Sequence, residues 1–474
     1  MSDGTKEGEG AATPQSQLKH ADQNPWYVLM TLYGDDHDKN RRVWNAWAGQ
    51  VWSQQQKDEL PEAPSLVLNE MQDWETLKDE VEDLFNKRWS SQKTEQPRLP
   101  DPRAEVDLSN LHFDQRLDLK GMVFPKQVSF AGSNIRFGIW ANNTWFHRLV
   151  SFSHTRIGET VIFDSAKFED HAIFGATKFI GDAQFDKVTF CNETHFFKAK
   201  FEASSSFILT EFRKEAKFSG CEFAGFSSFR AAKFFSNAGF QSVQFKGIAD
   251  FAESEFHASG TKGIAGIRFT DAIFSKPTSF RGATFKHSYP ELTNTDLYLV
   301  TDFSADALHW PEGLTVPSKE ARESCGIIRN LLSKKGLTED QHFFFRREMF
   351  FASHQEEWLS RIPYQVYGWL SDYGHSIARP FWGLFVVWFI GVAFFSAHFM
   401  ADLSGPLQDA NDWTALGLSF SNLFPVFGFG RVHFMEVLKN LPAGLQFLSG
   451  FQTVTSLPLL FFLGLGLRQR FRLR

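Results

Sequence analysis

The chain has 474 residues, a formal net charge of −6 and 54 phenylalanines, far more than a globular core of ordinary composition needs. The length suggests about three domains, and the three cysteines, Cys191, Cys221 and Cys325, have neither metal-ligand nor disulfide-framework spacing. No short apolar signal segment opens the sequence, so we do not expect the bulk of the chain to be secreted.

The first residues predict a tail followed by a cap. Residues 1–20 are rich in Gly, Ser, Gln and charge without apolar periodicity, which predicts a disordered tail. Residues 21–105 should form a helix-rich N-terminal cap region, in which the string NPWYVLMTLYG (24–34) is strand-like. The cap is needed because an open solenoid end exposes unpaired strand edge and apolar rings.

Two amphipathic helices are expected within this cap region. The first carries Trp44, Trp47 and Val51 on one face, and the second covers Leu66–Trp89. The tryptophans could line a ligand pocket, but a role in the core is favoured because large rings dominate core packing.

Phenylalanine recurs from Val161 to Phe256 at steps that alternate between five and six residues. The residue two positions before each of these phenylalanines is small or β-branched. An α-helix would place successive rings on opposite faces, whereas extended backbone points residues i−2 and i the same way. Each step is therefore one short strand and one corner of a solenoid, whose rings are buried by stacked neighbouring coils.

This small-x-Phe-x-x step resembles the pentapeptide-repeat family in its Phe-rich bacterial form. The resemblance implies a mainly β fold: a right-handed, four-sided β-helix over residues 106–316, with about nine coils of about 22 residues. At a strand spacing of about 4.8 Å the rod would be about 45 Å long. One of its four ring stacks should contain Phe163, Phe185, Phe207, Phe229 and Phe251.

The same phase continues on both sides of the phenylalanine-only portion. It runs back through apolar residues to Leu108, with Ala141 as the exception, where Ile139 in the preceding small position compensates. Seven residues are inserted around 257–266, which predicts a loop. Beyond this loop the inward positions should be Phe269, Phe274, Phe280 and Phe285 and, after a slip of one residue, Leu292, Leu297, Phe303, Leu308 and Leu314.

Charge argues against a nucleic-acid partner. Residues 108–314 contain 22 acidic and 22 basic side chains. A DNA mimic needs a negative field and a DNA-binding protein needs a basic stripe. No nucleic-acid partner is therefore expected for the rod.

A helical linker and a membrane hairpin follow the repeat. Residues 317–378 should be helical: one helix covers Ser318–Lys335, and the Thr338/Gln341 capping box opens another that reaches about Ser360. Residues 379–474 should form a hairpin of two transmembrane helices, at about 381–400 and 444–467.

Arginines flank the hairpin at both ends, which predicts cytoplasmic termini and a cytoplasmic β-helix. The strings SDYG and LGLGLRQRFRLR resemble the C-terminal membrane hairpin of the same bacterial family. That resemblance implies a multi-pass protein of the bacterial inner membrane, with bilayer lipids as partners.

No metalloprotease, phosphate-loop, nucleophile-elbow or dinucleotide-binding motif occurs, so the sequence proposes no catalytic, cofactor-binding or metal-binding residue and no enzyme activity.

The favoured function is a membrane-anchored scaffold or protein-interaction module with an unidentified protein partner; self-assembly of the chain is left open. The alternative is an ion-conducting pore, since Trp413–Gly430 could re-enter the membrane and Val426–Gly430 superficially resembles a potassium-channel filter. Against a filter, Phe427 and Val426 replace Val and Thr, Pro425 interrupts the approach and Arg431 places a cation at the exit.

Overall fold

The structure is a computed structural model, and it describes residues 18–53, 57, 69–90, 98–259, 266–311, 318–401, 407 and 410–470. The chain divides into two compact units, Met1–Phe344 and Phe345–Arg474, which are described here one after the other.

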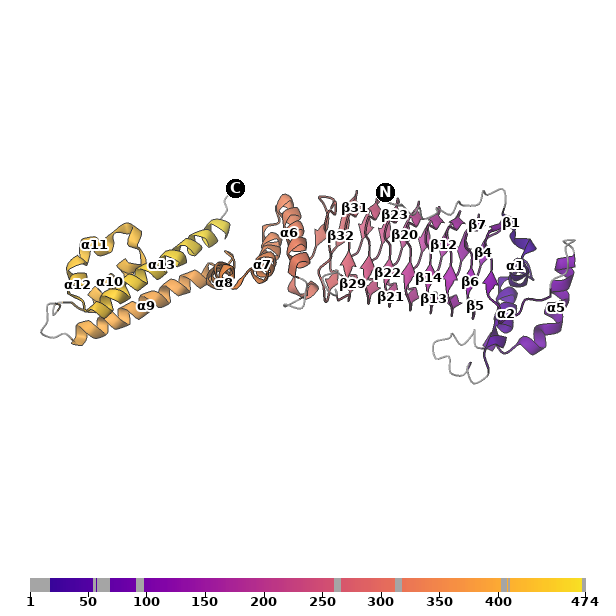
Figure 1. Cartoon of the computed structure of the whole chain (residues 1–474), viewed down its shortest axis with the longest axis horizontal. Helices are drawn as coiled ribbons and strands as arrows, with labels where there is room; N and C mark the ends of the chain where they lie inside the picture. The colour runs from indigo at the N-terminus through magenta and orange to yellow at the C-terminus, as the bar shows by residue number, and fades with distance from the viewer. Residues whose placement is uncertain are drawn as a thin grey trace, which may run out of the picture. The chain divides into compact units, whose positions relative to one another are not determined.

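Four parallel sheets form the walls of a four-sided β-solenoid of about nine turns within the first unit (Figure 1), which confirms the fold class expected from the sequence. Sheet A contains β1 (Lys19–His20), β3 (Leu111–Phe113), β7 (Asn134–Ile135), β11 (Arg156–Ile157), β15 (Lys178–Phe179), β19 (Lys200–Phe201), β23 (Glu222–Phe223), β27 (Gln244–Phe245) and β31 (Ile273–Phe274). Sheet B contains β2 (Val106–Asp107), β6 (Val128–Ser129), β10 (Val150–Ser151), β14 (Ala172–Ile173), β18 (Thr194–His195), β22 (Ala216–Lys217), β26 (Ala238–Gly239) and β30 (Ile267–Arg268). Sheet C contains β4 (Leu117–Asp118), β8 (Ile139–Trp140), β12 (Val161–Ile162), β16 (Ala183–Gln184), β20 (Ser205–Ser206), β24 (Ser227–Ser228), β28 (Ala249–Asp250), β32 (Thr278–Phe280) and β34 (Asp302–Phe303). Sheet D contains β5 (Val123–Phe124), β9 (Trp145–Phe146), β13 (Lys167–Phe168), β17 (Thr189–Phe190), β21 (Glu211–Phe212), β25 (Lys233–Phe234), β29 (Glu255–Phe256) and β33 (Thr284–Phe285).

The strand register confirms the coil length. Val161 pairs with Ala183 and Phe168 pairs with Phe190, so each strand lies on the strand 22 residues later. The separation becomes seven residues longer between Ala238 and Ile267, and one residue longer between Phe280 and Phe303. Both slips of phase occur where the sequence predicts them. Residues 260–265, at the centre of the predicted loop, lie outside the described residues.

Stacked phenylalanine rings fill the core. In the stack that contains Phe163, Phe185, Phe207, Phe229 and Phe251, neighbouring ring centroids are 4.8 to 5.2 Å apart, with interplanar angles of 2° to 15°. That separation matches the spacing of paired strands, so the backbone ladder sets it. Rings of opposite sheets meet edge to face, which is a favoured geometry for aromatic pairs. Phe196 and Phe207, for example, cross at 89° with their centroids 5.6 Å apart.

The small inward positions also satisfy the backbone. Thr155 Oγ1 donates to Phe130 O at 2.8 Å, and Cys221 Sγ donates to Phe196 O at 2.8 Å, in each case on the preceding coil. Cys221 is buried, and burial raises the pKa of its thiol, so the thiolate that would be reactive is disfavoured. Cys221 therefore belongs to the packed core.

The alternation of five- and six-residue steps comes from two kinds of corner. At the five-residue corner the Ala166 N–H donates to Phe163 O at 2.8 Å, and the intervening Ser165 has a φ of 58°. A type II turn requires this positive φ at its third residue. The left-handed residue recurs every eleven positions outside the two slips, at Asn110, Gly121, Gly132, Asn143, His154, Ser165, Ala176, Lys187, Lys198, Leu209, Gly220, Ala231, Ser242, Glu253, Asp271, Gly282 and Asn294.

The N-terminal cap differs from the sequence prediction in two places. The strand-like run is a helix, α1 (Pro25–Met30), because Pro25 occupies its first position and the Asn24 side chain accepts hydrogen bonds from Trp26 N and Tyr27 N. The tail prediction was too long, because β1 pairs with β3 and extends sheet A. Residues 1–17 lie outside the described residues.

The remaining cap elements are η2 (Ala21–Gln23), α2 (His37–Ala48), η3 (Gly49–Val51) and α5 (Trp74–Ser90). Trp44 and Trp47 are fully buried, so they belong to the core. The second expected helix begins at Trp74 rather than Leu66, and residues 58–68 lie outside the described part of the chain.

The C-terminal end of the solenoid corrects one inward position. Leu308 is 83% exposed, because it lies in the short helix η4 (Ala307–His309), whose N-terminus is capped by Asp306. Trp310 fills the place instead and stacks on Phe285 with a centroid separation of 4.8 Å. Leu314 lies outside the described residues. Helix α6 (Ser318–Lys335) closes this end, where Lys335 Nζ donates to Thr301 O at 3.1 Å.

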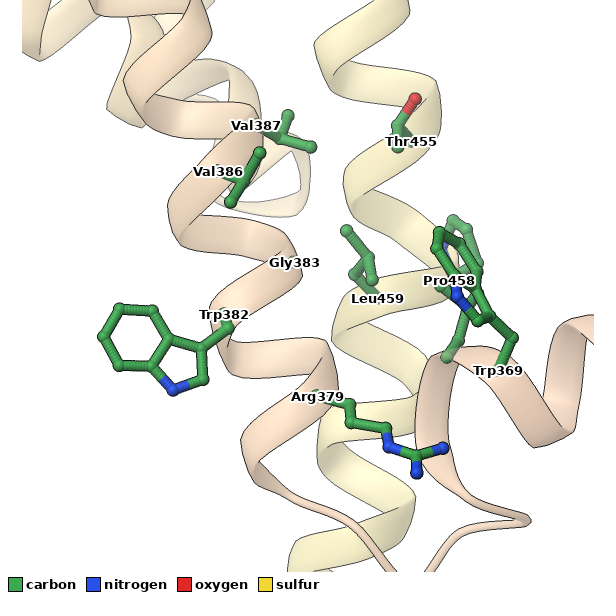
Figure 2. A pocket seen from close by; sticks show the side chains of 10 residues that line it. Trp369, Arg379, Trp382, Gly383, Val386, Val387, Thr455, Pro458 and Leu459 are labelled. Carbon is green, nitrogen blue, oxygen red and sulfur yellow. The ribbon is translucent and has the colours of Figure 1, made fainter.

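The other helices are α7 (Thr338–Gln355), α8 (Trp358–Ser371), α9 (Ala378–Ala401), α10 (Asp412–Leu423), η5 (Pro425–Phe427), α11 (Phe429–His433), α12 (Met435–Asn440) and α13 (Ala443–Arg470). The helix expected to reach Ser360 ends at Gln355, and a separate helix, α8, begins at Trp358. In the second unit α9 packs against α10 and α13, and α8, α9 and α13 border a groove (Figure 2).

Replacing one ring tests the inward assignment. Phe207→Ala should lower the free energy of unfolding by about 3 to 5 kcal/mol, because the cavity is flanked by rings on both neighbouring coils. Phe226→Ala is the matched control, since Phe226 is 47% exposed on the same solenoid. Thermal unfolding of the two detergent-solubilised variants, followed by circular dichroism, gives the comparison; equal midpoints would contradict the assignment.

Candidate interaction surfaces

The cap satisfies the open strand edge of the first coil. Strand β5 ends sheet D, so its outer backbone groups have no strand partner. Asn45 Oδ1 accepts from Val123 N at 2.9 Å, Asn45 Nδ2 donates to Gly121 O at 3.0 Å, and Trp44 Nε1 donates to Val123 O at 2.8 Å. Side chains of α2 thus take the place of another strand, as buried backbone groups require.

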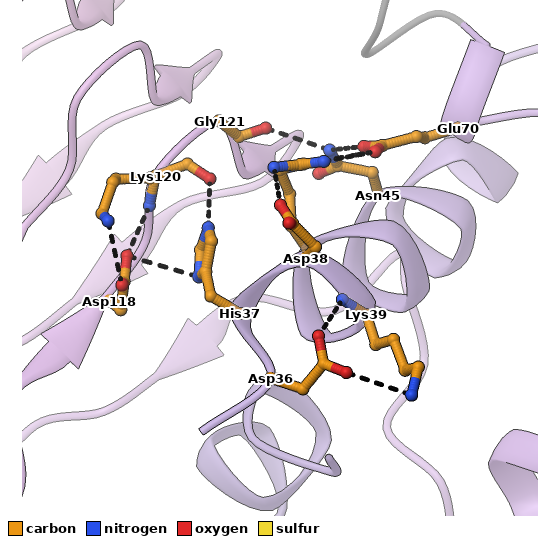
Figure 3. A network of polar contacts seen from close by, with 10 residues as sticks. Asp36, His37, Asp38, Lys39, Asn45, Glu70, Asp118, Lys120 and Gly121 are labelled. Carbon is orange, nitrogen blue, oxygen red and sulfur yellow. Dashed lines mark hydrogen bonds and ion pairs between the residues drawn. The ribbon is translucent and has the colours of Figure 1, made fainter. Parts of the chain in front are cut away.

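Charged side chains surround this edge (Figure 3). Arg41 pairs with Asp38 at 2.7 Å and with Glu70 at 3.1 Å, and Glu70 also accepts from Asn45. His37 Nε2 contacts Lys120 O at 2.9 Å and His37 Nδ1 lies 3.3 Å from Asp118. These groups are engaged with one another or with backbone, so the cluster joins the cap to the first coils.

Neither metal ligands nor a reactive thiol emerge from the described part of the chain. No group of three or more His, Cys, Asp or Glu side chains among these residues could hold a metal ion. None of the three cysteines forms a disulfide; Cys191 is half-buried and Cys325 is buried.

Opposite charges pair between coils on the solenoid walls. Lys178 lies 2.7 Å from Glu202, Lys217 lies 3.2 Å from Glu193, and Lys286 lies 3.0 Å from Glu255. The balanced composition of the repeat is therefore matched by local pairing.

An apolar ridge runs along the corner between sheets A and C. It consists of Phe226, Ile248, Pro277 and Val300, which occupy the same position on four successive coils. The ladder shows this directly, because Ser227 N donates to Ile248 O at 2.9 Å and Ala249 N donates to Pro277 O at 3.4 Å. Phe226, Ile248 and Val300 are each about half exposed. Single exposed apolar residues are ordinary, but an aligned series marks a candidate interaction surface.

The sequence carried a signal for this ridge that the periodic analysis did not use. Phe226 lies three positions after the inward Phe223, outside the small-x-Phe pattern, and Ile248 follows one coil later. Writing the sequence in rows of one coil, 22 residues each, would have placed Phe226 and Ile248 in the same column.

A second unpartnered apolar surface lies on α8. Trp358, Ile362, Val366 and Trp369 are exposed and recur at steps of three or four residues. This spacing places them on one face of the helix. An amphipathic helix with tryptophans on an uncovered face is typical of a helix lying in a membrane interface.

Two helices are long and apolar enough to cross a membrane. They are Ala378–Ala401 and Ala443–Arg468, with mean hydropathies of 2.0 and 1.5. In each, only 22% of the most apolar window is buried within the protein. The core helix of a soluble protein would be mostly buried, whereas most of the apolar surface of these two helices is not covered by the described part of the chain.

Buried polar side chains connect α9, α10 and α13. Gln452 of α13 donates from Nε2 to Val387 O of α9 at 2.8 Å and to Ser419 Oγ of α10 at 2.9 Å. Asn422 Nδ2 of α10 donates to Gln452 Oε1 at 3.0 Å. A Cβ at Gly391 would lie 1.9 Å from Gln452 Nε2, so a side chain at this position would displace the Gln452 amide from the network. The sequence analysis did not identify this network.

The backbone at the proposed filter is not extended. Pro425–Phe427 form the 3-10 helix η5, Gly428 has a φ of 71°, and α11 begins at Phe429. A carbonyl-lined filter requires several successive carbonyl groups facing one ion path. The described conformation does not provide that row, although α10 does lie beside both candidate spans.

Comparisons with protein families, with curated proteins and with solved structures find no match to this chain.

A pH prediction follows from an ion-paired corner of the solenoid. Burial opposes ionisation of Glu169, but His147 and Lys167, the latter 2.9 Å away, outweigh it and lower the carboxyl pKa to about 2. A lowered carboxyl pKa stabilises the fold above the unfolded-state value and ceases to do so as the pH falls through the folded-state value. Glu169→Gln should therefore cost roughly 2 kcal/mol near pH 7.

Chemical denaturation at several pH values measures this difference. The difference between wild type and Glu169→Gln should shrink from about pH 4.5 and vanish near pH 2. Glu105→Gln, at an exposed position outside the solenoid, is the control. A difference that is independent of pH would show that the charge of Glu169 contributes nothing.

Proposed function

We propose that the protein is a membrane-anchored, non-catalytic scaffold of the pentapeptide-repeat type, whose β-solenoid presents the apolar ridge to a protein partner. The observation that carries this proposal is the ridge itself, because it is an aligned apolar surface on a backbone that the ladder holds rigid. A Cβ on Gly247 would lie 2.0 Å from Gly225 O, so the corner beside Phe226 and Ile248 depends on glycine for its shape. A fixed surface loses little conformational entropy on binding.

Stacked Phe coils of 22 residues with a small residue two positions before each ring support the family assignment. In a solenoid each coil contacts only its neighbours, so the surface can carry a binding site without disturbing the core. We expect a partner with an apolar strip, since Lys200 and Lys246, on the neighbouring wall of sheet A, are already paired with Glu222.

The ridge can be tested by replacing its apolar side chains with charged ones. The double variant Phe226→Asp and Ile248→Asp should keep the melting temperature within a few degrees, because both side chains project outward. It should lose a partner that, in the otherwise intact chain, cross-links to a photoreactive residue placed at position 300, a ridge position that the double variant leaves unchanged. Lys200→Asp, on the wall of sheet A, is the control and should retain the cross-link. Retention of the same cross-linked partner by the double variant would contradict the proposed ridge.

Membrane anchorage by α9 and α13 is the second part of the proposal. Their uncovered apolar surfaces and the exposed stripe on α8 support it. Arg361 and Arg379 lie before and at the start of the first candidate span, and Arg468 and Arg470 lie at the end of the second, whereas the connection offers only Arg431 and Lys439. This asymmetry favours cytoplasmic ends and a cytoplasmic solenoid, at the inner membrane of a bacterium.

Reporter insertions test this topology. A reporter that is active only outside the cytoplasm should function when inserted at position 409 and stay silent when fused after Arg474, because the arginine-rich flanks remain inside. Activity at both positions, or complete release of the chain by alkaline carbonate, would contradict two spans.

A pore is the second candidate function. The observation in its favour is that α10 packs along α9 and α13 through Ala415, Leu418 and Leu423, so the connection re-enters if the two helices span the bilayer. Selective cation currents from the purified chain in planar bilayers, lost on Gly428→Val, would favour the pore over the scaffold.

A further inference from the structure

A groove of about 820 Å³ lies in the second unit between α8, α9 and α13 (Figure 2). Its walls are almost entirely apolar and include Leu370, Val386, Pro458 and Leu459. Gly383 lies in the groove where α9 approaches α13 closely. A Cβ at this position would lie only 2.9 Å from Leu459 Cδ2. The volume and lining suit a flexible hydrocarbon chain.

Arg379 is the charged residue of this lining. Its guanidinium points toward the α8 side of the groove (Figure 2), where Nη1 donates to Gly368 O at 3.0 Å. Among the described residues no carboxylate forms an ion pair with Arg379. An exposed guanidinium with several N–H groups still available suits a phosphate, which it can bind bidentately.

The cationic end of the groove coincides with the expected membrane surface. Gly466 of α13 lies against Ile377 just before α9, so Arg468 is at the same end of the helix pair as Arg379. Trp369 borders the groove, is 78% exposed and also belongs to the apolar stripe of α8. Tryptophan and arginine together are typical of the headgroup level.

Along α9 the groove extends from Arg379 to Val387, a length of about 12 Å at 1.5 Å per residue. The apolar part is therefore deeper in the hydrocarbon region than Arg379. A ligand with a negative headgroup and an acyl chain matches this order of charge and apolar wall.

We propose that the groove binds one anionic phospholipid of the bilayer, with an acyl chain between α9 and α13 and its phosphate on Arg379. This inference rests on the proposed membrane anchorage and adds a specific lipid site to it. The site fixes α8 to the two spans through a shared lipid, at the membrane surface.

Native mass spectrometry of the full-length chain in neutral detergent tests the site, with phosphatidylglycerol and phosphatidylcholine of identical acyl chains as probes. Wild type should retain phosphatidylglycerol in preference to phosphatidylcholine. Arg379→Gln should weaken phosphatidylglycerol binding about tenfold, as expected for loss of charge-assisted hydrogen bonds. Arg468→Gln, at the same end but outside the groove, should weaken it by less than about twofold.

A second pair of variants blocks the groove without changing charge. Val386→Trp should abolish retention of phosphatidylglycerol, whereas Val454→Trp, at an exposed position of α13 outside the lining, should leave it unchanged. This pair decides the question if Arg379→Gln lowers the melting temperature of the protein. Equal retention of the two lipids, equal effects of the two arginine variants, or wild-type binding by Val386→Trp would overturn the site.

Flotation with vesicles of phosphatidylcholine alone separates this inference from membrane anchorage. A chain that does not float would overturn anchorage itself. A chain that floats but shows no preference for phosphatidylglycerol would overturn the lipid site and leave anchorage standing.

Discussion

Stacking of each coil on the next is the constraint on which the structure depends. A ladder spacing of about 4.8 Å admits one ring per coil in each stack, and the Phe185 and Phe207 rings are 4.9 Å apart. Coils can change length only where the extra residues leave the stack intact, as between Ala238 and Ile267. The ends have no further coil to stack on, so Asn45 and Trp44 close one end and Trp310 closes the other.

Periodicity predicted this core because burial and spacing were both visible in the sequence, and it failed where local hydrogen bonds decide the conformation. Trp26–Met30 is uniformly apolar, so pattern alone could not distinguish strand from helix; the Asn24 cap decided it. Leu308 matched the phase but lies in a capped turn. The left-handed conformation of corner residues such as Leu209 and Lys187 could not be predicted from their residue types. The surrounding ladder imposes this conformation, although their side chains disfavour it.

The surfaces with functional potential were harder to predict than the core because they obey no repeat of residue type. The ridge depends on the position of each residue within its coil. Phe226 is the same residue type as the inward phenylalanines, but its position in the coil leaves its side chain exposed. The spacing of the α8 stripe was present in the sequence, yet it was assigned in part to the preceding helix and in part to a linker. In both cases the topology had to be known before a neighbouring position could be recognised as a surface.

Polar residues explain how a short, mostly apolar helix is fixed between two longer ones. Among apolar helices in a bilayer, burial from water gives no preference for one helix contact over another, because lipid is as apolar as the protein surface. Gln452 fixes how these helices pack, because its side-chain amide forms hydrogen bonds both to α9, at Val387 O, and to α10, at Ser419 and Asn422. Displacing α10 would leave these groups unsatisfied in an apolar surrounding. Most of the apolar surface of α9 and α13 is not buried by the described part of the chain, and the groove that ends at Arg379 lies between these two helices and α8. Internal polar contacts thus fix the helix bundle, and the groove remains available for the anionic ligand that we propose for Arg379.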